Sequence, residues 1–124
     1  MNNERGFATL EVILMITVLG ILSAIAVPRF TSVITSANTA KVQADLSTID
    51  NAIALYQMEN GSDPIELSQL SKYIQDVTEL KPPTGSMYVK GDEKKITGPG
   101  YVINDNRAKL DGYTAGEITK NKST

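Results

Sequence analysis

The stretch Gly6-Phe7-Ala8-Thr9-Leu10-Glu11 and the apolar run that follows it, residues 12–27, decide how this chain folds. From Phe7 to Val27 the sequence holds one charge, Glu11. As a helix, these residues would be about 31 Å long at ~1.5 Å per residue, enough to cross a hydrocarbon core of ~30 Å. A carboxylate inside such a segment costs roughly 2.5–3.5 kcal/mol near the centre and less near an end, so it marks a site that meets a partner.

The composition excludes several classes of function. A chain of 124 residues forms one domain at most. It has neither Cys nor His, so it lacks thiolate ligands and the commonest general base, and an ordinary hydrolase is not expected. From Arg29 onward 11 Lys and Arg residues face 12 Asp and Glu residues, which is not the basic surface that a nucleic-acid-binding domain requires.

The flanks of the apolar run set the expected orientation. Arg5 and the amino terminus are the cations before the run, so residues 1–6 are expected to stay cytoplasmic while everything after Val27 is translocated. A secretory signal peptide is the alternative, because Ala24-Ile25-Ala26 resembles a small-residue cleavage site. Against it, the run is longer than a usual signal-peptide core and contains Glu11.

Helical periodicity continues beyond the apolar run. Apolar residues recur at spacings of three and four and predict one buried stripe: Phe30, Val33, Ala37, Val42, Leu46, Ile49, Ile53 and Tyr56. Gly61 and the proline after it, Pro64, predict the stop, so one helix is expected from Phe7 to about Asn60. Gly20 and Pro28 are its two weak points, interpreted either as tolerated kinks or as sites where the helix loosens.

The carboxy-terminal half changes to shorter elements. Residues 65–76 predict a second helix, and residues 86–90, 100–104 and 112–118 predict strands separated by turn-rich joints. We expect a small antiparallel sheet of three or four strands that packs on the stripe of the long helix, because neither piece would be stable alone. The fold class is therefore α+β.

The opening stretch resembles a known family. Gly6-Phe7 followed four residues later by Glu11, at the head of an apolar helix with Pro28 and Phe30 at its far end, is similar to the amino-terminal segment of type IV pilins and pseudopilins. The resemblance is strong over residues 1–30, moderate to Pro64 and only architectural beyond. Ala8 shifts the usual hydroxyl residue by one position, and the chain lacks the cysteine pair that closes a loop in many major pilins.

The resemblance implies how the chain would be processed and assembled. A prepilin peptidase would remove the leader, residues 1–6, by cutting between Gly6 and Phe7, and would methylate the new amine of Phe7. Residues 7–28 would wait in the cytoplasmic membrane, and an assembly ATPase with its platform would extrude the chain into a helical homopolymer. Residues 29–124 would form the globular head on the outside of a surface or periplasm-spanning filament. No cofactor, metal or catalytic residue is implied.

The physical chemistry agrees with a filament subunit without enzymatic activity. Cleavage creates a cationic amine on Phe7, and Glu11 of the same or a neighbouring chain is the acidic partner at hand. A pair between chains in a low-dielectric bundle fixes register rather than adding much stability. The alternative is a carboxylate at the interface of an ordinary membrane anchor.

Several functions remain open at this stage. The filament would serve as a pilus, as a type II secretion pseudopilus or as a competence filament that takes up DNA. A small basic cluster is formed by Lys90, Lys94 and Lys95. It is interpreted either as a contact for phosphate groups or as the solvated edge of a hairpin. Asp105 and Asp111 with neighbouring asparagines are interpreted as turns rather than as a calcium loop. The other classes are a membrane-anchored or secreted binding domain and, weakest, an enzyme.

Overall fold

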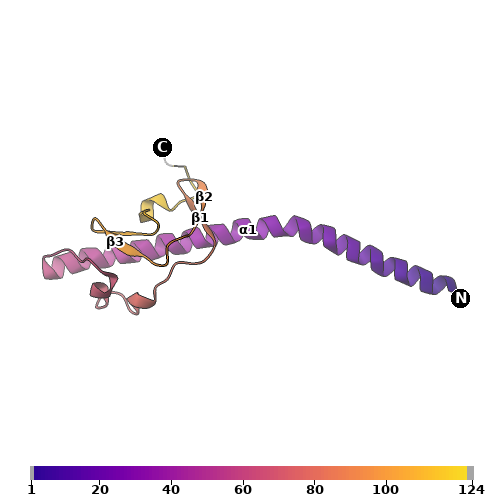
Figure 1. Ribbon diagram of the computed structural model, residues 1–124, viewed down its shortest axis with the longest axis horizontal. Coiled ribbons are helices and arrows are strands. Elements are labelled where there is room, and N and C mark those ends of the chain that lie inside the picture. The colour runs from indigo at the N-terminus through magenta and orange to yellow at the C-terminus, as the bar shows by residue number, and fades with distance from the viewer. Residues whose placement is uncertain (1, 123–124) are drawn as a thin grey trace. The chain divides into compact units, whose positions relative to one another are not determined.

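The computed structural model describes residues 2–122, and the side chains of residues 2–4 and 26–29 lie outside that description. One helix of 59 residues, α1 (Asn2–Asn60), takes up the amino-terminal half of the chain (Figure 1). The chain divides into two compact units, Met1–Ile34 and Thr35–Thr124, and α1 contributes to both. We call the second unit the head. The predicted end of the helix at Asn60 is confirmed, whereas its start lies at Asn2 rather than Phe7, because nothing in the short polar leader breaks a helix.

The core of the head is built on the stripe of α1. The stripe residues Val42, Leu46, Ile49 and Ile53 are almost fully buried. They pack with buried side chains from the rest of the head: Leu70, Ile74, Val77, Met87, Val89, Tyr101, Ala108, Leu110, Ala115 and Ile118. The predicted start of the stripe is wrong: Phe30 and Val33 are about two-thirds exposed and Ala37 is also exposed. The first buried residues of α1 are polar instead, Thr35, Asn38 and Thr39.

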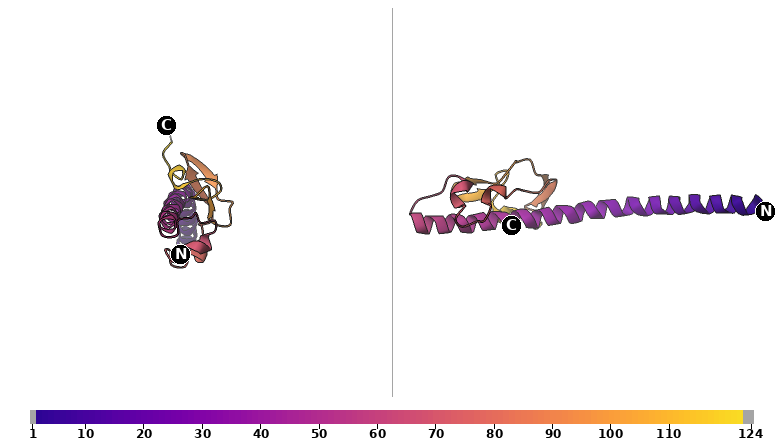
Figure 2. Two further views of the ribbon diagram at one scale, coloured as in Figure 1. Left: turned by 90° about the vertical axis from the view of Figure 1, so that its left-hand side faces the viewer. Right: turned by 90° about the horizontal axis from the view of Figure 1, so that it is seen from below.

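Two antiparallel hairpins lie along the head portion of α1 (Figures 1 and 2). The first pairs β1 (Ser86–Val89) with β2 (Asp92–Lys95), and the second pairs β3 (Val102–Asn104) with β4 (Arg107–Lys109). The antiparallel pairing is confirmed, but the strands form two separate two-stranded sheets rather than one. Each hairpin closes on two residues with positive φ, Lys90-Gly91 and Asp105-Asn106, as tight hairpin turns require.

Two predicted elements are replaced by short 3₁₀ helices. Residues 65–76 hold η1 (Leu67–Leu70) and irregular turns, with η2 (Val77–Glu79) beyond them, because left-handed Asp76 separates the two turns and so short a helix gains little cooperativity. The predicted strand over residues 112–118 is wrong. It contains η3 (Ala115–Glu117), which begins at a reciprocal cap between Thr114 and Glu117.

Polar side chains of α1 hold the outer edge of β1. The amide of Asn38 donates to the carbonyl of Ser86 at 3.0 Å, and the backbone N–H of Tyr88 donates to the hydroxyl of Thr39 at 2.8 Å. These bonds satisfy backbone groups that β2, on the other side of β1, does not reach. The polar start of the buried stripe therefore serves as an anchor for the first hairpin.

A carboxylate of α1 does the same for β4. The backbone N–H of Ala108 donates to Asp50 at 2.7 Å, and the guanidinium of Arg107 pairs with the other oxygen of Asp50 at 3.2 Å. A single half-buried side chain thus fixes the second hairpin by one backbone and one ionic contact.

Candidate functional site: the exposed apolar face of α1

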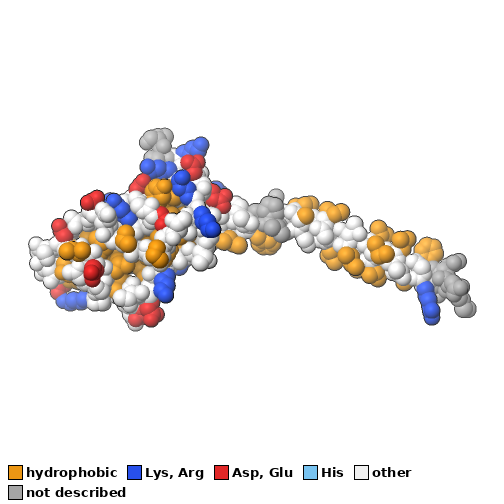
Figure 3. Space-filling view, in the orientation of Figure 1, with side chains coloured by type: hydrophobic (Ala, Val, Ile, Leu, Met, Phe, Trp, Pro, Cys, Tyr) orange, Lys and Arg blue, Asp and Glu red, His pale blue; other side chains and the backbone are white. Residues whose placement is uncertain are grey.

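The amino-terminal part of α1 exposes its apolar side chains on every face. Residues 5–25 are all exposed, with Phe7 at 70%, Ile16 at 64% and Leu19 at 61% (Figure 3). Among the described residues this is the one helix long and apolar enough to cross a membrane, a test that a signal sequence would also pass. So much exposed apolar surface on a soluble molecule marks a site for lipid or for other protein chains.

The few hydroxyls in this stretch are satisfied within the helix. Thr9, Thr17 and Ser23 each donate to the carbonyl four residues earlier, at 2.7–3.0 Å. The backbone hydrogen bonds of α1 are also internal. The polar groups of residues 5–25 that still need water or a partner are therefore the charged side chains of Arg5 and Glu11. The segment is compatible with a hydrocarbon or a dry protein bundle.

Glu11 stands at the head of one apolar groove. The groove follows the helical spacing of its lining residues, which are Glu11, Leu14, Met15, Val18 and Leu19. The carboxylate of Glu11 makes no hydrogen bond or ion pair with any other described residue of its own chain. Its acidic charge is therefore available to a group that arrives from elsewhere.

Gly6 and Phe7, the predicted cleavage position, lie one helical turn before Glu11. Both are exposed, and a Cβ added at Gly6 would meet nothing within 4 Å. The fold of this chain thus does not require glycine at position 6. Phe7 precedes Glu11 by four residues, so the two share a face of α1. The predicted roles of Gly6, Phe7 and Glu11 stay predictions.

The two predicted weak points of the helix lie within its continuous span. α1 passes through Gly20, whose surroundings leave room for a Cβ, and through the position of Pro28. The side chain of Pro28 falls outside the described side chains. Helix flexibility at Gly20 and Pro28 therefore remains a prediction.

The two other candidate sites have ordinary structural roles. Asp105 belongs to the tight turn between β3 and β4, and Asp111 accepts the backbone N–H of Thr97 at 2.9 Å. Within residues 2–122 no group of three metal-ligating side chains comes together. Lys90 pairs with Glu117 at 3.1 Å, while Lys94 lies on the exposed strand β2, as expected of a solvated hairpin edge.

Carboxylates of α1 that the sequence analysis missed bond to side chains in the rest of the head. Glu59 near the end of α1 accepts from Lys72 and from Tyr73, and its pKa is lowered chiefly by the bond from Lys72. Asp45 accepts the hydroxyl of Tyr101 at 2.5 Å, and burial followed by this bond raises the pKa of Tyr101. The one feature of the sequence that could have indicated these contacts is the set of acidic residues that flank the apolar stripe of α1.

The chain is similar to named bacterial proteins over between 41% and 72% of its length. It is 27% identical to type II secretion system core protein G of Escherichia coli (strain K12) over 72% of this chain and 60% of that protein. It is 34% identical to the type IV major alpha-pilin of Moraxella bovis over 58% of this chain and 46% of that protein. With the type IV narrow pilus major component PilA5 of Thermus thermophilus it shares 41% identity over 41% of this chain and 44% of that protein.

The chain spans about half the length of the curated relatives it matches. No family model and no solved structure gives a significant match. The relatives are both pilins and secretion pseudopilins, and the structure has the single long apolar helix and the small antiparallel head that the opening motif predicts. In sequence and in this arrangement of elements, the chain is similar to type IV pilins and pseudopilins.

Proposed function

We propose that this chain is a structural subunit of a type IV pilus or a related filament. A prepilin peptidase cleaves it between Gly6 and Phe7 and methylates Phe7, and the subunit then polymerises through α1 without any catalytic role of its own. The observation that carries the proposal is the exposed apolar segment of α1, residues 5–25, with one carboxylate, Glu11, that has no partner among the described residues.

The energetics of this helix favour a polymer of its own kind. Before assembly, residues 7–28 reside in the cytoplasmic membrane, with the leader inside and the head outside. In the filament, the same apolar side chains bury one another, at roughly 25 cal/mol for each Å² removed from water. Contacts between different surfaces of neighbouring copies do not close, so they generate an open filament. The amine of Phe7 pairs with Glu11 of a neighbour and fixes the register.

The decisive experiment combines mass spectrometry of the mature amino terminus with electron microscopy of the cell surface or of a purified filament. A methylated Phe7 as first residue, found in fibres that a deletion strain lacks, is the expected result. A chain that retains residues 1–6 and enters no fibre would overturn the proposal. A mature chain that begins at Val27 would instead identify a signal peptide and a secreted binding domain.

A pseudopilin of a type II secretion or competence system is the second candidate. The similarity to core protein G supports a secretion pseudopilin, and the similarity to the major alpha-pilin supports a pilus to the same degree. Loss of protein secretion without loss of surface fibres in a deletion strain would select it. DNA is a partner only of a competence filament, whose DNA binding should weaken with salt and in the Lys94→Ala/Lys95→Ala variant.

A further inference from the structure

The peptide bond that the proposed peptidase cuts lies inside a regular helix. Because α1 begins at Asn2, the bond between Gly6 and Phe7 lies in its second turn and not before its start. In an α-helix the N–H groups of residues 7–10 bond to the carbonyls of residues 3–6, and these hydrogen bonds cross the bond to be cut. The carbonyl oxygen of Gly6 is therefore already bonded to the N–H of Leu10.

Hydrolysis requires this carbonyl to be accessible. Water adds to the carbonyl carbon of Gly6 and the C–N bond breaks, which leaves a carboxylate on Gly6 and an amine on Phe7. Negative charge develops on the carbonyl oxygen during the addition, and groups of the peptidase must stabilise it. In the closed helix the N–H of Leu10 takes that place and the neighbouring turns of backbone surround the carbon. The turn must therefore open before the peptidase can act.

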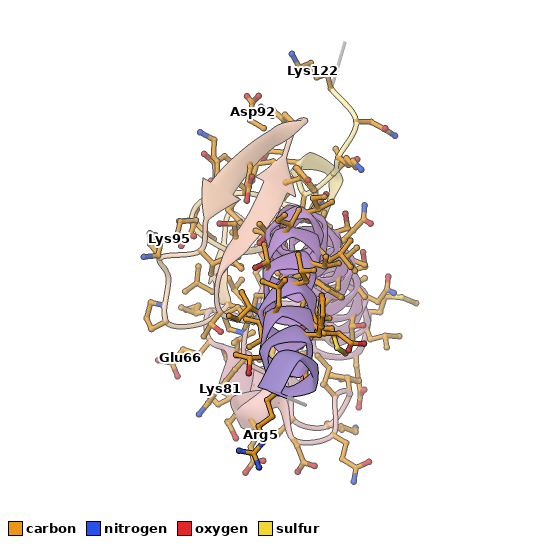
Figure 4. All side chains as sticks on the ribbon, turned by 90° about the vertical axis from the view of Figure 1, so that its right-hand side faces the viewer. Arg5, Glu66, Lys81, Asp92, Lys95 and Lys122 are labelled. Carbon is orange, nitrogen blue, oxygen red and sulfur yellow. The ribbon has the colours of Figure 1, made fainter. Side chains whose placement is uncertain are left out.

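One side chain adds a further hydrogen bond across the same turn. The hydroxyl of Thr9 donates to the carbonyl of Arg5 at 3.0 Å, so this bond spans the cleavage position as the backbone bonds do. The guanidinium of Arg5 points away from the end of α1 in Figure 4, and the contact uses the main-chain carbonyl alone. Thr17 and Ser23 make the same kind of bond, but both lie beyond the cleavage position. Within residues 5–25, Thr9 is thus the one hydroxyl whose bond crosses it.

Gly6 has the opposite effect on this turn. Glycine in a helix shifts the equilibrium towards the open chain by about two- to five-fold relative to alanine. Residues 5–10 are exposed, and a turn so near a helix end opens readily. In the apolar surroundings of the membrane, however, no water replaces the Arg5 carbonyl as a partner of the Thr9 hydroxyl. Opening of the turn therefore loses the Thr9 bond without compensation.

We propose that Thr9 is a positioning residue for removal of the leader and that its hydroxyl keeps the turn around the Gly6–Phe7 bond closed. The inference rests on the proposed function, which supplies the peptidase. The peptidase cuts the fraction of chains in which residues 5–9 have unwound, and the Thr9 hydroxyl makes that fraction smaller. Gly6 and Thr9 together set the rate at which the amine of Phe7 is produced.

The substitution Thr9→Val tests this role, because valine keeps the branched shape and a similar helix propensity but has no hydroxyl. The full-length precursor in phospholipid vesicles is treated with a limiting amount of a prepilin peptidase, and mass spectrometry follows the loss of residues 1–6. We expect cleavage about two- to ten-fold faster than in the wild type, the range for one hydrogen bond. Thr9→Ser retains the hydroxyl and should be cleaved at the wild-type rate. Thr17→Val loses the same kind of bond outside this turn and should also leave the rate unchanged.

Hydrogen exchange of the precursor without peptidase measures the opening of the turn directly. In Thr9→Val the amides of residues 7–10 should exchange faster by the same factor as the cleavage rate. In Thr17→Val and Thr9→Ser their exchange should match that of the wild type. Faster cleavage of Thr9→Val without faster exchange would show that the peptidase responds to the side chain itself, which overturns the inference.

The remaining outcomes separate this inference from the proposed function. Wild-type cleavage between Gly6 and Phe7 with an unchanged or slower rate in Thr9→Val overturns the inference and leaves the proposed function standing. Equal acceleration in Thr9→Ser and Thr9→Val also overturns it, because the hydroxyl is then not the cause. If the peptidase does not cut the wild-type chain between Gly6 and Phe7 at all, the proposed function fails, and the inference fails with it.

Discussion

At the scale of single residues, the proposed function depends most on Glu11. It is the one charge in an exposed apolar segment and makes no ionic contact with the described part of its chain. A carboxylate in such a segment is unfavourable in free energy, so it indicates a partner whose pairing fixes a specific arrangement. In the proposed function the partner is the amine of Phe7, which exists only after cleavage, so that proposal couples processing to assembly through one ion pair.

The substitution Glu11→Ala should leave processing intact but impair assembly. Removing one partner of a buried pair strands the other charge, a loss of roughly 3–5 kcal/mol. Filament counts by electron microscopy and the mass of the amino terminus measure the two effects separately. Thr17→Ala is the matched control, because the Thr17 hydroxyl bonds only within its own helix. Normal filament numbers in Glu11→Ala would exclude Glu11 as the register residue.

Substitutions of Gly6 should act on processing and not on folding. A Cβ at position 6 meets nothing, so Gly6→Ala should fold normally and be cleaved in part. Gly6→Leu should leave full-length precursor in the membrane, because the bulky side chain must fit the peptidase. Immunoblots that resolve precursor from mature chain check the result. Efficient cleavage of Gly6→Leu would place the processing site elsewhere.

At the scale of elements, each hairpin is held by side chains of α1 as well as by its own short ladder. β3 and β4 pair over three residues only, and an isolated hairpin of that size is marginal in water. Asp50 supplies the missing bonds to Ala108 and Arg107 from the helix. The attachment of strands to α1 by side chains is thus a condition for the head to form.

The substitution Asp50→Ala should loosen the second hairpin. It leaves the backbone N–H of Ala108 without its acceptor, which costs about 1–3 kcal/mol, or roughly 4–8 °C in melting temperature for each kcal/mol in a domain of this size. Thermal unfolding of the full chain in detergent, followed by circular dichroism, measures the shift. Asp92→Ala, on the exposed strand β2, is the control for charge removal. An equal shift in both variants would show that Asp50 acts through net charge alone.

At the scale of the whole molecule, carboxylates tie distant parts of the head together. Glu117 accepts the backbone N–H of Thr114, which is the main cause of its lowered pKa, and it also pairs with Lys90 of the first hairpin. Glu59 joins the end of α1 to Lys72 in the same manner. Tyr101 shows the opposite shift, a pKa raised by burial and by Asp45.

These shifts predict a stability plateau between mildly acidic and alkaline pH. For Glu117 and Glu59, whose folded pKa is lowered, the contribution is present above the unfolded pKa of about 4.3 and is lost as the pH falls through the folded pKa. For Tyr101, whose folded pKa is raised, it is present below the unfolded pKa of about 10 and is lost as the pH rises beyond it. Denaturant unfolding of the head at a series of pH values checks both limbs. Glu117→Gln should flatten the acidic limb and Tyr101→Phe the alkaline one; unchanged slopes would assign them to other groups.

Local sequence patterns were enough to predict the long helix, its end near Asn60, its apolar half and the lone carboxylate at position 11, because periodicity and helix stops act over a few neighbouring residues. It also indicated strands at β1 and β3, although their partners β2 and β4 were assigned to joints, since strands of charged residues such as Asp92 to Lys95 show no apolar alternation. The capping pair Thr114 and Glu117 is present in the sequence and was the local signal for a 3₁₀ turn that the predicted strand over residues 112–118 overlooked.

Long-range contacts in the folded chain, which no local pattern predicts, make the strands form two hairpins rather than one sheet. The bonds that hold them join Asn38 to Ser86 and Asp50 to Ala108, across 48 and 58 positions of sequence. The groove between β3 and residues 65–67 follows from the same long-range contacts, because the edge of a strand meets whatever the rest of the chain places beside it. Local patterns fix where a helix or strand can begin, and the pairing of distant polar groups fixes which surfaces remain for a neighbour.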